Sequence, residues 1–475
     1  MGYWHRSIPQ PSLAARARDP LAVAIGNASL LGAGYLLLGR RPLAAVTGLV
    51  TVALVTFHTA VARSVWSETV VLLWWAALVG HGYLLADGRV CGQRSPVRGQ
   101  RLVALGVAVP VLLAVGLLRL DAAGIEGAVT DARRSGDCAR ALTALDRVRP
   151  EHRVVDAALT VRGERTGDAC RRLQLGGANL TAALTGNTLA LQAGFDVLAG
   201  VLAELPGHEQ MVDAVLGGFL ERLPKAEPCA LAALTDWLRQ RPPDGSVLDR
   251  SADVVAPTAP AALTGCGDEL MAAADWTQAR GRYQQLLDQY PGDALTATAS
   301  AGVERATVAI ELATVRSLLQ GPTSTQPEYC SSPARYRAAA PYRKGSNRAM
   351  IFGNDEYANR LPASWRATDA AQAVLVVCAG EESHGAAVRT CPYENKRFPE
   401  FPTYVTFHKV AIPVQVYELR TGKLVADTKV QIGGASCPRV LHYTTYYTDF
   451  GPPADVYVAA SDADVRAGFR ALLNR

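Results

Sequence analysis

Residues that could do chemistry gather in one short stretch near the C-terminus. The four residues Glu381 to His384 form the run Glu-Glu-Ser-His in a Gly-flanked segment that could serve a nucleophile or a metal. An adjacent Ser-His pair cannot itself form the geometry in which a base polarises a hydroxyl, so we interpret the stretch as an exposed loop. His408 in a predicted strand and His442 in a Tyr-rich segment have no partner at ligand spacing, which favours structural roles for both.

Two more histidines, His58 and His81, lie in apolar stretches. If these stretches cross a membrane and the part of the chain after residue 120 is extracytoplasmic, the two histidines are about 12 Å apart along the membrane normal at 1.5 Å per residue, so a shared metal is not expected. No phosphate loop, dinucleotide fingerprint, HExxH or GxSxG motif occurs. The sequence therefore predicts no catalytic, cofactor-binding or metal-binding residue, no cofactor, and a protein that is not an enzyme.

The elements that would position any site begin with four apolar runs. They cover residues 21–38, 43–62, 69–86 and 101–120 and follow a basic tail, residues 1–20, that we expect to be disordered. Each run has about 18 to 20 residues, enough to cross ~30 Å of hydrocarbon. No small-residue cleavage site follows the first run, so a removable signal peptide is not expected. The sequence predicts an α-helical membrane anchor of four spans in residues 21–120.

Charge is concentrated in this anchor. Residues 1–120 hold eleven Arg against three acidic residues, a balance of +8, which leaves −3 for the rest of a chain whose total is +5. Basic residues beside membrane helices serve orientation and lipid headgroups. Membrane lipid is therefore an expected partner, and nucleic acid is not.

Cysteines decide the expected orientation, because the positive-inside rule does not. Cys91 is alone in the anchor, whereas eight cysteines follow the last apolar run. An even set of cysteines favours four disulfides in an extracytoplasmic portion, attached to a bacterial plasma membrane by several spans. Eight reduced cysteines in a cytosolic portion are the alternative. We expect Cys391 to pair with Cys437, because each precedes Pro at a strand end. Proximity alone suggests the pairs Cys138–Cys170, Cys229–Cys266 and Cys330–Cys378.

Residues 121–320 are rich in Ala and Leu at helical spacing and predict six to nine helices. The segment SGDCARALTALDRVRP at 135–150 is echoed at 166–173 and at 229–243. Residues 266–293 resemble one tetratricopeptide repeat, with the matching positions Gly267, Ala279, Tyr283, Leu286 and Pro291. This resemblance implies stacked helix pairs with a concave face that binds peptides or proteins. An irregular helical domain with an Ala-Leu bias is the alternative.

Residues 321–346 read as a Pro- and Ser-rich linker, and residues 347–475 predict a small α+β C-terminal domain with an antiparallel sheet. Arg420 to Lys423 indicates a hairpin, and Pro413 favours an edge strand or a bulge. Ser461 and Asp464 indicate the start of a final helix with an apolar stripe of Val465, Phe469 and Leu472. Strands are expected at 350–353, 373–379, 404–419, 424–432 and 456–459.

The order of these parts resembles that of uncharacterised actinobacterial multi-span membrane proteins with tetratricopeptide-like helical repeats, a resemblance that implies no activity. We interpret the chain as a membrane-anchored cell-envelope scaffold that binds a protein or peptide through its helical region. One alternative is an envelope sensor or assembly factor that binds a small ligand or wall component through the C-terminal domain. Another is an envelope hydrolase, which converging hydroxyl, His and carboxyl groups around residues 381–384 would favour.

Overall fold

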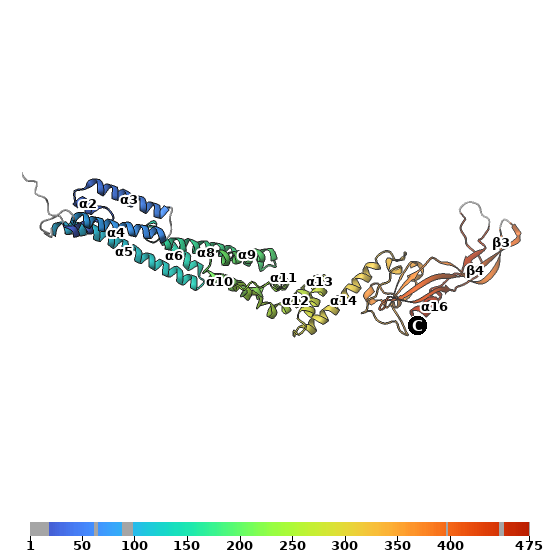
Figure 1. Cartoon of the computed structure of the whole chain (residues 1–475). Coiled ribbons are helices and arrows are strands. Elements are labelled where there is room, and N and C mark those ends of the chain that lie inside the picture. The colour runs from blue at the N-terminus through green and yellow to red at the C-terminus, as the bar shows by residue number, and fades with distance from the viewer. Residues whose placement is uncertain (1–18, 61–64, 88–97, 396–397, 446–450, 475) are drawn as a thin grey trace, which may run out of the picture. The chain divides into compact units, whose positions relative to one another are not determined.

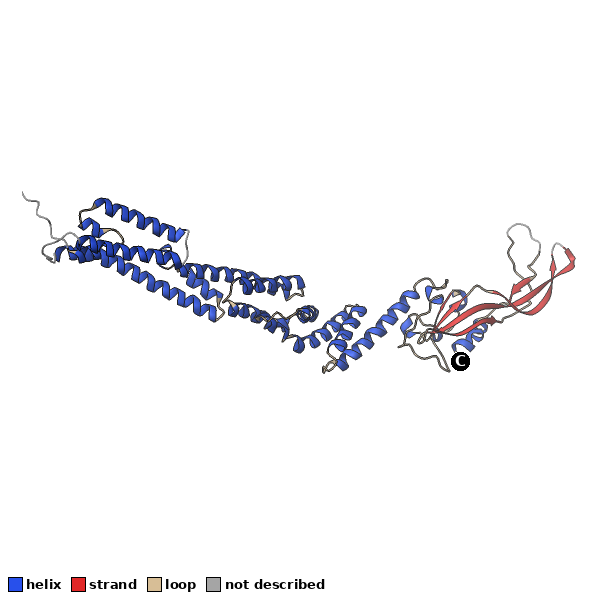
Figure 2. Ribbon diagram, viewed as in Figure 1, coloured by secondary structure: helices blue, strands red, loops and turns tan. Residues whose placement is uncertain are grey.

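The computed structural model describes residues 19–60, 65–87, 98–395, 398–445 and 451–474. The basic tail up to residue 18 and Cys91 therefore lie outside the described residues. The chain forms two compact units, Met1–Ala259 and Pro260–Arg475. Among the described residues, the first unit is helical, and all strands lie in the second (Figures 1 and 2).

The helices of the first unit run in one series from the apolar segment to the Ala- and Leu-rich segment. They are α1 (Pro20–Asn27), α2 (Ala33–Leu37), α3 (Arg41–Ala60), α4 (Val65–Asp87), α5 (Arg98–Arg134), α6 (Cys138–Leu145), α7 (Pro150–Val155), α8 (Ala157–Ala183), α9 (Thr188–Glu204), α10 (Glu209–Leu220), η1 (Leu223–Lys225), α11 (Pro228–Gln240) and η2 (Val247–Ala252). Helix α12 (Val255–Ala272) starts at the end of this unit.

The prediction of four spans is wrong for the described residues, in which two helices are long and apolar enough to cross a membrane. They are Glu68–Asp87 within α4 and Arg98–Arg134, which is α5. The second predicted run gives the shorter apolar stretch Arg41–Phe57, which rises only about 25 Å. Helix α5 has 37 residues and continues well past its apolar part.

The first predicted run is two short helices instead of one span. Leu30 and Gly32 both have positive φ, at 65° and 67°, and this turn ends α1 and starts α2. Asn27 at the end of α1 is fully buried, and its Nδ2 donates to the Leu78 carbonyl at 3.1 Å. Hydropathy over residues 21–38 could not reveal the break, because the break depends on a contact with α4.

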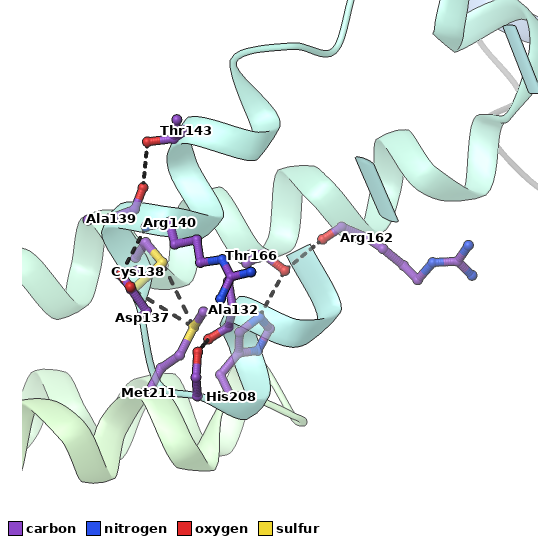
Figure 3. Close-up of a disulfide and its surroundings, with 12 residues drawn as sticks. Ala132, Asp137, Cys138, Ala139, Arg140, Thr143, Arg162, Thr166, His208 and Met211 are labelled. Atoms are coloured by element: carbon purple, nitrogen blue, oxygen red, sulfur yellow. Dashed lines mark hydrogen bonds between the residues drawn. A yellow bond between two sulfur atoms is a disulfide. The ribbon is translucent and has the colours of Figure 1, made fainter. Parts of the chain in front are cut away.

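Beyond the apolar segment, a disulfide joins α6 to α8. Cys138 and Cys170 have Cα atoms 5.4 Å apart, and both sulfur atoms lie against the Met211 sulfur of α10, at 3.8 and 3.9 Å (Figure 3). Beside them, His208 Nε2 and the Thr166 hydroxyl are 3.2 Å apart. Three helices thus share one buried cluster, which explains why cysteines 32 residues apart can pair.

The first internal echo in this region, at 166–173, does not mark an equivalent element. In residues 135–142, Asp137 caps the start of α6 by accepting from the Arg140 amide. The corresponding Asp168 of the first echo lies inside the 27-residue helix α8. The same letters therefore begin one helix and continue another, and this echo is not a structural repeat.

In the second unit, the segment that resembles a tetratricopeptide repeat, residues 266–293, comprises the end of α12 and the whole of the next helix. Helix α13 (Trp276–Gln289) follows α12, and α14 (Thr296–Leu318) follows α13. Ala279, Tyr283 and Leu286 are all fully buried. A methyl group added at Gly267 would lie 2.5 Å from the Tyr283 ring. The spacing thus predicted the buried face of this unit.

The C-terminal sheet is built around one long strand. Its strands are β1 (Ala349–Phe352), β2 (Leu375–Ala379), β3 (Ser383–Asn395), β4 (Phe398–Glu418), β5 (Lys423–Ile432) and β6 (Asp455–Tyr457). The order is β1-β2-β4-β3, and β5 and β6 also pair with β4. Short helices connect or flank the strands: η3 (Glu328–Cys330), α15 (Asp355–Ala358), η4 (Ala363–Trp365), η5 (Ala370–Gln372) and α16 (Asp462–Leu473).

Three sheet predictions need correction. The sheet is mixed, because β1 pairs in parallel with β2 and β6 in parallel with β4, pairings that no strand pattern encodes. Strand β4 is central and not an edge strand. Along one side of β4, the paired strand changes from β2, which ends opposite Val414, to β3, which starts opposite Ala411, and Pro413 lies between these two pairings. Residues 383–384 lie in β3, which sequence reasoning missed because Gly385 and Pro392 interrupt its pattern.

Each face of the sheet has its own core. Val465 and Phe469 of α16 cover one face, and Val315 and Leu319 at the end of α14 cover the other. Ser461 and Asp464 form the predicted capping box, although Leu473, which is fully buried, completes the stripe in place of Leu472. Residues 321–346 contribute buried Tyr329, Tyr336 and Ala339 to the second core, so this stretch belongs to the folded unit.

Three of the expected disulfide pairs form, and all eight cysteines after residue 121 are disulfide-bonded. Cys330–Cys378 and Cys391–Cys437 have Cα separations of 5.9 Å. Cys229 and Cys266 are both bonded. Disulfides persist in oxidising compartments, which favours an extracytoplasmic position for the parts that carry them.

Candidate functional site

The first unit contains an open cleft of about 520 Å³ between α9 and α11, which we call the aromatic cleft. Its floor is formed by Phe195 and Trp237, whose rings are tilted at 54° with centroids 5.0 Å apart. Its remaining lining residues are Gln192, Asp196, Ala199, Gln240, Arg241, Pro242, Pro243, Asp244 and Leu248. The cleft therefore combines an aromatic floor with a polar rim, as recognition sites commonly do.

The chain builds one wall of this cleft by stopping a helix. Pro242 and Pro243 end α11, since Pro cannot continue a helix without losing a backbone hydrogen bond. The side chain of Arg241 then lies with its guanidinium 5.5 Å from the Phe195 ring centre. Its nitrogens bind Asp244 at 2.5 Å and Asp249 at 3.0 Å. Asp249 also accepts from the amides of Asp244 and Gly245, so the turn is held in one arrangement.

The electrostatics of the aromatic cleft are acidic. Hydrogen bonds from Ser246 lower the pKa of Asp244. The pKa of Asp249 is lowered mainly by the hydrogen bond that it accepts from the Asp244 backbone amide, and further by the one from the Gly245 amide. Both carboxylates are thus anionic at neutral pH, and one Arg241 neutralises only part of their charge. Asp196 adds an exposed carboxylate at the rim. A basic group beside an apolar side chain complements this site.

The stretch that could do chemistry in the C-terminal domain acquires partners that the sequence did not suggest. The His384 ring stacks on His408, with centroids 5.0 Å apart, and lies 4.6 Å from the Tyr457 ring. His408 Nδ1 is 3.0 Å from the Gly385 carbonyl, and its Nε2 is 2.7 Å from Asp455 Oδ1. Strand β4 thereby places His408 between β3 and β6.

This geometry gives His408 a structural task. Both of its ring nitrogens face acceptors, and the hydrogen bond to Gly385, followed by that to Asp455, raises the pKa of His408. The protonated ring can donate to both acceptors, whereas the neutral ring can donate to only one of them. The nearby Ser383 hydroxyl donates to the Ala411 carbonyl at 3.2 Å. Ser383 and His408 are thus each hydrogen-bonded to a backbone carbonyl, that of Ala411 and that of Gly385.

The other sequence candidates are scattered. Glu381 and His442 are exposed. Glu382 lies near Tyr357. Burial, and then the charge of Glu382, raises the pKa of Tyr357 to about 12. His81 lies in α4 with its Nδ1 2.7 Å from the Tyr35 hydroxyl, and the side chain of His58 lies outside the described part of the chain. Among the described residues, no group of three or more His, Cys, Asp or Glu could hold a metal ion.

Comparison of the chain with protein families, curated proteins and solved structures finds no match. Sequence reasoning missed the aromatic cleft, although the Pro-Pro stop after an aromatic helix, WLRQRPPD, was a local signal for one of its walls. Phe195 lies in another helix, and no local signal joined it to Trp237.

Proposed function

We propose that this protein is a membrane-anchored scaffold of the bacterial cell envelope that binds a peptide segment of a partner protein in the aromatic cleft. The observation that carries the proposal is the aromatic floor of Phe195 and Trp237 beside the acidic rim. An apolar side chain of the partner would contact the half-buried Trp237 ring, which packs on buried Phe195, and a neighbouring basic residue would approach Asp196 and Asp244. Aromatic anchors of this kind supply most of the binding energy in many interfaces.

The anchor in this proposal consists of α4, α5 and the shorter helices packed on them, with membrane lipid around their apolar faces. Leu102, Leu113 and Leu120 on α5 are 71%, 57% and 72% exposed, which would be costly in water and favourable in hydrocarbon. The disulfide-bonded cysteines support an extracytoplasmic position for the rest of the chain.

Peptide selection tests the function. A random peptide library is selected on the full-length protein in detergent micelles, and the dissociation constants of the selected peptides are measured by fluorescence anisotropy. We expect enrichment of a basic residue next to an apolar or aromatic one. Ala199 is exposed and lines the cleft, so Ala199→Trp should fill the cleft and weaken binding about tenfold or more.

The matched control is Ala193→Trp, the same substitution at an exposed alanine of α9 outside the cleft lining, which should bind as the unaltered protein does. Selection of peptides without a basic residue, or equal loss of affinity in both Trp variants, would reject the aromatic cleft as the site.

Compartment is tested separately by thiol labelling of intact cells and of denatured, unreduced protein. The proposal expects Cys91 as the only free thiol, with the other eight cysteines paired. Four or more free thiols among those eight would place the soluble portion on the cytoplasmic side.

A further inference from the structure

A second cleft, of about 710 Å³, lies in the C-terminal domain beside the edge strand β1. We call it the arginine cleft, since Arg316, Arg348 and Arg366 all line it. They come from the last turn of α14, from the approach to β1 and from the segment after η4. The sequence suggested no binding residue here, because the three arginines are separated by 32 and 18 residues.

The three arginines differ in how far their charge is compensated. Arg316 forms a two-point ion pair with Asp369, with nitrogen–oxygen distances of 3.0 and 2.9 Å, and this hydrogen bonding lowers the pKa of Asp369. Arg348 donates through Nε and Nη2 to the carbonyl of Arg366, at 3.2 and 3.1 Å. Among the described residues, no carboxylate pairs with Arg348 or Arg366.

Arg366 is also incompletely bonded. Its Nη1 lies 3.3 Å from Asn359 Oδ1, whereas its Nε is buried without any hydrogen-bond partner among the described residues. A planar guanidinium offers several donors in a fixed geometry that matches a carboxylate. Arg348 and Arg366 thus provide two cations whose terminal nitrogens a bound anion could satisfy.

Strand β1 adds backbone groups to the same cleft. On its outer edge, Ala349 O accepts from Ala367 N and Gly353 N donates to Thr323 O, both at 2.8 Å. The backbone groups of residues two apart in a strand point to the same edge. The amide and carbonyl of Ile351 therefore point to the outer edge, between the hydrogen bonds made by Ala349 and Gly353. No described residue pairs with that edge at Ile351, and Ile351 lines the cleft.

We propose that the arginine cleft binds the carboxyl-terminal residue of a peptide. Its carboxylate would lie against Arg348 and Arg366, and its amide would pair with the open edge at Ile351, as strand addition to a sheet edge does elsewhere. The cleft would then recognise a free carboxyl end, whereas the aromatic cleft takes an internal basic and apolar segment.

The test compares two pools of acetylated tripeptides that are identical except at the last group, one with a free carboxylate and one amidated. Retention by the full-length protein in micelles is measured by equilibrium dialysis with mass spectrometry. We expect members of the carboxylate pool to be retained about tenfold or more above their amidated counterparts. Equal retention of the two pools would overturn the proposal.

Two variants probe the cleft without touching a core. Arg348→Gln removes an exposed cation, and Ala363→Trp blocks the cleft from an exposed lining position; both should abolish the preference for the carboxylate pool. Arg343→Gln, at an exposed arginine outside the lining, and Ala199→Trp in the aromatic cleft should leave it unchanged.

A preference that survives both cleft variants would assign the binding elsewhere. Displacement of the peptides by inorganic phosphate at the same concentration would show a simple anion site and would likewise overturn the proposal. The Ala199→Trp variant blocks the aromatic cleft alone. A carboxylate preference that it leaves unchanged therefore tests the arginine cleft independently of peptide binding in the aromatic cleft.

Discussion

Two places in this protein use glycine to bring helices together, and they fill the space with opposite chemistry. Around Tyr283, Gly267 of α12 and Gly302 of α14 leave room for an aromatic ring. Around Asn27, Gly34 of α2 and Gly82 of α4 leave room for an amide.

The difference follows from the surroundings of the two sites. The Tyr283 ring is removed from water on folding, so hydrophobic burial stabilises its packing, and its hydroxyl reaches Asp268 at 2.5 Å. Asn27 lies in the apolar segment, where burying one more apolar group gains little if lipid surrounds the helices. A hydrogen bond to the Leu78 carbonyl joins the helices there instead. The same close packing thus depends on burial in one region and on a polar contact in the other.

The largest expected effect is that of Tyr283→Ala. Removal of a fully buried ring leaves a cavity that two glycines cannot fill, at a cost of about 3 to 5 kcal/mol. Hydrogen exchange by mass spectrometry of the full-length protein should show loss of protection across residues 260–318. Gln284→Ala, at an exposed position of the same helix, should not. Unchanged protection in Tyr283→Ala would remove burial as the basis of this packing.

Ala279→Trp tests the same region by overfilling it. Ala279 is fully buried, and an indole there should cost roughly 1 to 3 kcal/mol or more. The readout is the melting temperature of the full-length protein, compared with Arg280→Trp at the exposed neighbouring position. If both variants melt as the unaltered protein does, the match to repeat spacing is accidental.

Gly34→Ala probes the polar site. The added methyl group would overlap the Val23 carbonyl and the Asn27 amide, and we expect a loss of about 1 kcal/mol or somewhat more, the lower end of overpacking effects. Gly48→Ala is the matched control, because a methyl group there meets nothing within 4 Å. Thermal unfolding in micelles should separate the two. A Gly34→Ala protein as stable as Gly48→Ala would show that Asn27 is not closely packed.

The smallest effect concerns pH and the exposed polar contact at His408. The pKa of His408 is raised in the folded protein, because the protonated ring bonds to both Gly385 of β3 and Asp455 of β6. The stability that these two hydrogen bonds add is fully present below the ordinary histidine pKa of about 6.5. It is lost as pH rises through the raised value. Hydrogen exchange at residues 455–457, corrected for intrinsic rates, should therefore be slower at pH 5.5 than at pH 8.5. The same pH difference in His408→Gln would assign the effect to another group.

Much of the local structure could be predicted from residues alone. The cap of Ser461 with Asp464, the turn at Gly422 and the buried Ala279, Tyr283 and Leu286 are encoded within a few residues of one another, where spacing and turn chemistry act directly. The even number of cysteines after the last apolar run likewise indicated disulfides correctly.

Features that join distant segments were decided only by the tertiary structure. The break at Leu30 and Gly32 depends on α4, and the mixed sheet depends on which neighbours β4 accepts. Phe195 meets Trp237 across 42 residues of chain, and Arg348 meets the carbonyl of Arg366 across 18. Local spacing indicated the buried faces of single elements such as α13 and α16. The two clefts arise where separate elements pack together, and no periodicity in one segment records the identity of its neighbour.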